Sequence, residues 1–154
     1  MTFQLCAALL VGLAACITDL RDRTIPNWIP ASALAGGLGW HAAVAGWSGV
    51  ALALGGALCG FLAFLVFYLL GGMGGGDVKL TAGFGALLGL PALFQALLWI
   101  CLAGGLAAAG VVYWRRMRRL WQPDGGGSAA RNADFIPYAP AIAAGAWITL
   151  WVRM

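Results

Sequence analysis

The sequence predicts an all-α integral membrane protein, a bundle of about six transmembrane helices. Of its 154 residues, 62% are hydrophobic and only 9% are charged, and the mean hydropathy is +0.89. A soluble domain carries about 25% charged residues, so this chain cannot cover itself with a polar surface. Its length suits about six apolar runs of roughly 20 residues joined by short loops. We therefore expect residues 1–154 to form a single transmembrane domain.

The first three apolar runs are expected at residues 2–18, 28–45 and 49–70. Pro26 lies between the first two, where it lacks a backbone donor and turns the chain. The third run contains glycines at positions 56 and 60, a spacing that lets a neighbouring helix approach closely. A stretch rich in glycine then follows.

The remaining runs are expected at residues 78–90, 92–114 and 137–152. The run 78–90 is short for a complete crossing, which tilting or local thinning of the bilayer would allow. Pro91 marks the next turn. The long polar segment 115–136 opens with four arginines and continues into a flexible glycine-rich composition.

The distribution of charge predicts the orientation in the membrane. Eight of the nine basic residues and all five acids follow the first, third or fifth run. The positive-inside bias places these three segments in the cytoplasm and both termini outside. The net charge of +4 thus reflects membrane topology and not a nucleic-acid partner. Asp19 and Asp77 are expected at the same, cytoplasmic face.

The stretch 71–80, GGMGGGDVKL, is where the chain carries its most informative pattern. Five glycines among positions 71–76 predict an interrupted helix, because each costs a helix about 1 kcal/mol relative to alanine. Asp77 follows them, and a carboxylate at a helix break within a membrane indicates a functional site. The alternative is a plain cytoplasmic loop with Asp77 solvated. Gly74, Gly75 and Gly76 would let a peptide backbone approach Asp77, or present hydrogen-bonding groups to an extended substrate.

Two carboxylates held close together can hydrolyse a peptide bond. They share a proton, so that one acts as general base on water while the other donates to the carbonyl oxygen. No cofactor is expected. The sole histidine, His41, belongs towards the opposite face, so a Ser-His-Asp arrangement is not expected. The four cysteines lack the spacing of a metal site or a disulfide set, and no metal is expected.

Several motifs together resemble the type IV prepilin peptidases, membrane aspartic endopeptidases of the GxGD class. Residues 74–77 read GGGD and are followed by Val-Lys-Leu. Asp19 ends the first run shortly before Ile-Pro-Asn at 25–27, and residues 135–140 read FIPYAP. GxGD alone is a weak signal in a glycine-rich chain. The ordered combination is much more specific, and it covers nearly the whole sequence.

The resemblance implies that Asp19 and Asp77 are the two catalytic aspartates. It also implies a function: removal of the short basic leader from pilin-like precursors at the cytoplasmic face of the bacterial inner membrane. The sequence lacks the paired cysteines of the extra domain associated with N-methylation. It therefore resembles the short form found in Flp-type, or tight adherence, systems. The implied partners are a prepilin-like precursor, membrane lipid and the pilus assembly machinery.

Other residues near the expected site have competing interpretations. Asp22 lies between two arginines and is expected to be solvated or salt-bridged. Lys79 either steadies the charge of Asp77 or anchors the chain at the positive-inside face. Asn27 either hydrogen-bonds near the site or, more simply, caps the second helix. Pro137 shapes the start of the last helix and, by the resemblance, borders the active site.

Two other classes of function remain open from the sequence. In a small proton-coupled transporter, Asp77 would relay an ion. The acids are expected at one face, however, and the chain shows no convincing repeated halves. A non-catalytic assembly factor would rely on small-residue helix packing alone. Neither alternative explains a pairing of Asp19 with Asp77.

Overall fold

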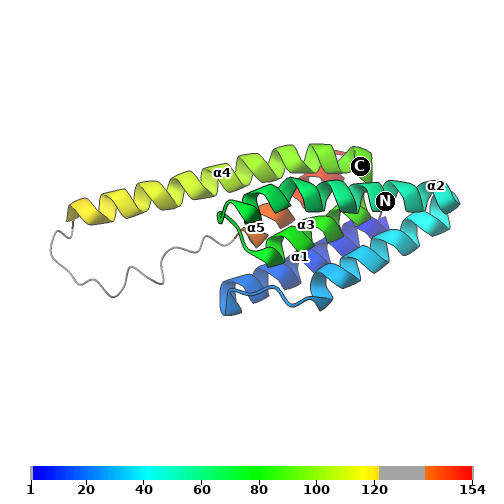
Figure 1. Cartoon of the computed structure of the whole chain (residues 1–154), viewed down its shortest axis with the longest axis horizontal. Coiled ribbons are helices and arrows are strands. Elements are labelled where there is room, and N and C mark those ends of the chain that lie inside the picture. The colour runs from blue at the N-terminus through cyan, green and yellow to red at the C-terminus, as the bar shows by residue number, and fades with distance from the viewer. Residues whose placement is uncertain (1, 122–137, 154) are drawn as a thin grey trace.

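In the computed structural model, which describes residues 2–121 and 138–153, the regular elements are all α-helices (Figure 1). This confirms the all-α class. The helices are α1 (Thr2–Asp22), α2 (Trp28–Leu69), α3 (Gly75–Leu88), α4 (Leu90–Trp121) and α5 (Ala139–Val152).

Helix α2 consists of two antiparallel arms. Gly46 interrupts it with φ 58° and ψ −138°, a conformation that side-chain-bearing residues rarely adopt. Figure 1 shows the chain reversing there, so that residues 28–45 and 47–69 run side by side with α3. The two arms match the second and third predicted apolar runs.

Three of the described helices are long and apolar enough to cross a membrane, judged by length and composition. Their residue ranges are Phe3–Asp22, Trp28–Leu69 and Leu90–Trp114. The shorter apolar helix Ala139–Val152 and the 14-residue α3 complete the bundle. The figure of about six crossings stays a prediction.

Helix α3 lies at the centre of the bundle. It contacts each of the other four helices, and ten of its 14 residues are buried. Glycines allow this close approach: Gly56 of α2 faces the backbone of Gly85, and a Cβ at Gly60 would lie 2.8 Å from the carbonyl oxygen of Thr81. The other arm of α2 approaches through Gly37, where a Cβ would lie 2.6 Å from the carbonyl oxygen of Ala86. The close helix approach predicted from Gly56 and Gly60 is thus present.

The helix boundaries differ from the predicted ones in two places. Helix α3 begins at Gly75, so the break after α2 is shorter than the predicted break over 71–76. Helix α4 continues through the arginines to Trp121, beyond the expected end at 114, because arginine is a good helix former. The turn between α3 and α4 is made by Gly89, with φ 74°, and Pro91 lies in the first turn of α4.

The arrangement places the expected site at one end of the bundle. In Figure 1, the end of α1 and the segment before α3 lie at one end, while both termini lie at the other. Helix α5 packs against both α1 and α4. The last turn of α1, the first turn of α3 and the start of α5 therefore come together.

Candidate active site

Asp19 lies in the last turn of α1 and is almost completely buried. Its side chain is only 3% exposed. The backbone N–H of Ala139, the first residue of α5, donates a 3.4 Å hydrogen bond to Asp19 Oδ2. The N-terminus of a helix carries a partial positive charge, so the start of α5 offsets part of the cost of burying a charge at Asp19.

Asp77 lies in the first turn of α3, and it is buried to the same extent, at 3% exposed. The first turn forms because Gly74 is extended, with ψ 148°, and its carbonyl oxygen accepts the N–H of Asp77 at 3.1 Å. One carboxylate oxygen, Asp77 Oδ1, is buried without a hydrogen-bond partner among the described residues. A buried polar atom left unpaired costs about 1–3 kcal/mol.

The two carboxyl groups affect each other electrostatically. Asp77 lies in the first turn of α3, which is not one of the three helices long and apolar enough to cross a membrane. Burial raises the pKa of Asp77, the charge of Asp19 raises it as well, and the backbone of Gly74 lowers it; the net result is a pKa of about 7. The structure thus brings together two aspartates separated by 58 residues in the chain (77 minus 19). Asp19 has a helix N-terminus as its partner, whereas Asp77 has a pKa close to neutral pH.

Lys79 and Asn27 contact each other and not the carboxylates. Lys79 Nζ donates a 2.9 Å hydrogen bond to Asn27 Oδ1. Asn27 occupies the N-cap position of α2, as predicted, but its side chain makes no capping hydrogen bond. Its amide oxygen is instead engaged by Lys79. The contact ties the segment between α1 and α2 to the first turns of α3.

The glycines before Asp77 serve close packing. A Cβ at Gly76 would lie 3.1 Å from Cβ of Ile25, and one at Gly75 would lie 3.5 Å from the ring of Tyr68. Because Gly75 and Gly76 are helical, they do not offer the extended edge that strand addition requires. Only Gly74 keeps an extended backbone.

The other predicted site residues have different outcomes. Asp22 is exposed, in contrast to Asp19 one turn earlier. Pro137 lies outside the described residues. Tyr138 and Ala139, which follow it, are described, and the backbone N–H of Ala139 is the contact that sequence reasoning missed. A main-chain donor has no residue-type signature, although the FIPYAP motif contains it.

His41 of α2 lies beside the last turn of α3, at the opposite end of that helix from Asp77. Its Nε2 is 3.3 Å from the carbonyl oxygen of Leu87, which also accepts a 2.8 Å hydrogen bond from Gln4 Nε2. These side chains satisfy a carbonyl in the last turn of α3 that the helix itself leaves unpaired. Within residues 2–121 and 138–153, no three His, Cys, Asp or Glu side chains gather in a way that could hold a metal ion.

Comparisons with known proteins identify a family and several relatives. Residues 6–109 match the family described as "Type IV leader peptidase family". A prepilin leader peptidase/N-methyltransferase of Bacillus subtilis (strain 168) is 33% identical over 84% of this chain and 47% of the relative. A protein of the same name from Burkholderia pseudomallei (strain 1026b) is 36% identical over 97% of this chain and 45% of the relative. The chain thus spans about half the length of these curated relatives. No solved structure matches it.

Proposed function

Because the chain belongs to the type IV leader peptidase family, we propose that it is a membrane-embedded aspartic endopeptidase that removes leader peptides from prepilin-like precursors. The observation that carries the proposal is the buried pair of Asp19 and Asp77, from α1 and α3, with Asp19 acting on the pKa of Asp77. Only the peptidase half of the relatives' name is proposed here, since the chain spans about half their length.

The different surroundings of the two carboxyl groups assign their roles. Asp19, which accepts the N–H of Ala139 at the start of α5, is the ionised general base that takes a proton from water. Asp77, with a pKa of about 7 and an unpaired Oδ1, is the acid that donates to the scissile carbonyl oxygen. In the hydrolysis, the water oxygen bonds to the carbonyl carbon. The C–N bond then breaks: the proton that Asp19 took from water passes to the leaving amine, and the former carbonyl oxygen returns its proton to Asp77 as the C=O bond re-forms.

The position of the pair supports cleavage at a membrane surface. Both carboxyl groups lie at one end of the bundle, and the basic residues Arg21, Arg23 and Lys79 lie near them in the chain. The positive-inside bias makes this end cytoplasmic. We place the protein in the bacterial inner membrane, with a precursor of the Flp type as substrate and with lipid and the pilus assembly machinery as partners.

The test is cleavage of a prepilin-like precursor in a bacterial host that lacks prepilin peptidases. Co-expression with this chain is expected to shorten the precursor, and mass spectrometry is expected to locate one new N-terminus at the end of the basic leader. Inhibitors of serine and metalloproteases should leave the cleavage unchanged. A precursor that stays full-length beside a membrane-inserted, folded protein would refute the proposed activity for that precursor class.

A further inference from the structure

A hollow in the side of the bundle is lined by residues from the segment before α3 and from the start of α5, the two segments that position the aspartates. It has a volume of about 300 Å³ and is formed by the second arm of α2, the segment before α3, α4 and the start of α5. We call it the α2–α4–α5 groove. The residues that line it include Phe64, Phe67, Met73, Cys101, Gly105 and Tyr138.

Two residues that line the groove are sequence neighbours of the residues that position the aspartates. Met73, in its wall, immediately precedes Gly74, whose carbonyl oxygen accepts the N–H of Asp77. Tyr138, on another wall, immediately precedes Ala139, whose N–H donates to Asp19. A group seated in the groove is therefore held beside the two segments that position the carboxyl groups.

The chemistry of the groove selects an apolar side chain. Phe64, Phe67 and Met73 contribute apolar surface, and among the residues that the structure describes, none that lines the groove is charged. A volume of about 300 Å³ is at the small end of ligand pockets, with room for one or two large side chains and not for a whole helix. Phe67 is 50% exposed, so the rim opens sideways towards the apolar surroundings of the bundle.

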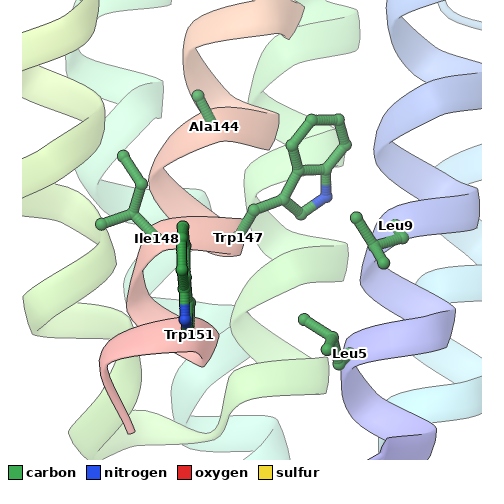
Figure 2. Close-up of a pocket in the computed structure, with 6 residues that line it drawn as sticks. All are labelled: Leu5, Leu9, Ala144, Trp147, Ile148 and Trp151. Carbon is green, nitrogen blue, oxygen red and sulfur yellow. The ribbon is translucent and has the colours of Figure 1, made fainter. Parts of the chain in front are cut away.

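A second hollow, of about 450 Å³, lies between α1 and α5 but is remote from the aspartates (Figure 2). It is lined by Leu5 and Leu9 of α1 and by Trp147 and Trp151 of α5, among others. Leu9 is ten residues before Asp19, which corresponds to about 15 Å along a helix. An apolar hollow alone therefore does not identify a substrate site, whereas proximity to both catalytic segments distinguishes the α2–α4–α5 groove.

We infer that the α2–α4–α5 groove is a specificity subsite, which binds a large apolar side chain of the precursor next to the bond that is cleaved. This rests on the proposed leader-peptidase function. The apolar segment of the precursor enters sideways past Phe67, while its basic leader stays at the end of the bundle that carries the aspartates. Binding in the groove sets the position of the scissile bond between the carboxyl groups.

The first experiment fills the groove. A Cβ at Gly105 would meet no atom within 4 Å, so Gly105→Leu adds bulk to the groove without a backbone clash. Gly110→Leu is the matched control, because Gly110 lies on the same helix with equally open space but does not line the groove. Gly105→Leu is expected to raise the KM for a purified prepilin-like precursor about tenfold, with little change in kcat.

The outcomes separate this inference from the proposed function. If Gly105→Leu cleaves the precursor with the KM of the wild type and of Gly110→Leu, the subsite is refuted while the peptidase stands. If wild-type protein cleaves no precursor, the proposed function fails, and the subsite with it. Thermal unfolding of both variants in detergent checks that neither substitution has disrupted the fold.

A second experiment reports contact directly through Cys101, which lines the groove. Precursors with one cysteine each, in the apolar segment or in the leader, are treated with a short bifunctional thiol reagent in the presence of Asp77→Asn protein. Cross-links to Cys101 are expected from the first turn of the apolar segment and not from the leader. Cys101→Ala should abolish them, whereas Cys6→Ala on α1 should not. Cross-linking to Cys101 only from the leader, or from neither segment, would refute the inference and leave lipid as the occupant.

Discussion

At the residue scale, the two aspartates have the same burial and different partners. Asp19 accepts a backbone N–H from the start of α5, whereas one oxygen of Asp77 has no hydrogen-bond partner in the described part of the chain. An unpaired acceptor on a buried carboxyl group favours the protonated form, because desolvation disfavours the charged one. The same unpaired oxygen is free to meet a substrate. The difference between the partners of the two groups therefore supports the assignment of acid and base.

The pKa of Asp77 makes stability depend on pH. It is raised from its ordinary value of 3.8 to about 7 in the folded protein. Between these pH values the folded state holds a proton that the unfolded state releases, so the free energy of unfolding falls as pH rises from about 4 to about 7. The side chain of the Asp77→Asn variant stays neutral at every pH. Its free energy of unfolding is therefore expected to fall less than that of the wild type as the pH rises over this range. Thermal unfolding in detergent at pH 5 and pH 8 measures the difference.

The control for this measurement is Asp22→Asn, since Asp22 is exposed. It should follow the wild-type dependence on pH. A variant Asp77→Asn whose midpoint temperature shifts with pH as much as that of the wild type would show that Asp77 does not carry the buried proton.

At the scale of elements, α3 is positioned by glycines of both arms of α2. Glycine lets helices approach to backbone contact, and the first turn of α3 carries Asp77. Gly56 faces the backbone of Gly85, so a side chain at either position requires the helices to separate. The central helix thus depends on residues that have no chemistry of their own.

Gly56→Ala is accordingly expected to destabilise the protein by about 1–3 kcal/mol, as overpacking does, and to lower precursor cleavage by displacing Asp77. Its neighbour provides the control. A Cβ at Gly55 would have Leu90 Cδ2 as its nearest atom, at an ordinary 3.7 Å, so Gly55→Ala should be tolerated. Thermal unfolding and cleavage of both variants test this, and equal behaviour of the two would contradict the packing account.

Sequence patterns predict the elements better than their boundaries or side-chain contacts. Charge sparsity predicts the helical membrane bundle, and the spacing of Gly56 and Gly60 predicts the close approach. The number of glycines at 71–76 overestimates the length of the helix break. Gly75 and Gly76 are part of α3, because tertiary packing outweighs their low intrinsic helix propensity. The pairing of Lys79 with Asn27, and the N–H that Ala139 donates, arise from three-dimensional neighbours that no local pattern specifies.

At the scale of the whole molecule, the ends of the bundle differ in chemistry. The end of α1 and the start of α3, which carry the aspartates, lie at one end, and the termini and the reversal within α2 lie at the other (Figure 1). The positive-inside bias orients the first end towards the cytoplasm. A cytoplasmic leader would reach the carboxyl groups from that side without crossing the membrane.

This orientation is tested by single cysteines in a background without the four native ones. Thr24 and Ser48 are both exposed, in the segment after α1 and just after Gly46 respectively. Thr24→Cys is expected to react with a membrane-impermeant maleimide only in inverted vesicles, and Ser48→Cys only in intact spheroplasts. Labelling of both from one side would contradict the arrangement of the crossings.

The central claim is that Asp19 and Asp77 together hydrolyse a peptide bond, and precursor cleavage by asparagine variants tests it most directly. Asp19→Asn and Asp77→Asn are each expected to lower the cleavage rate by about a hundredfold or more while the protein still inserts, because each removes one half of the acid–base pair. Asp22→Asn, three residues after Asp19 and exposed, is expected to cleave at close to the wild-type rate. Near wild-type cleavage by either Asp19→Asn or Asp77→Asn would contradict the account.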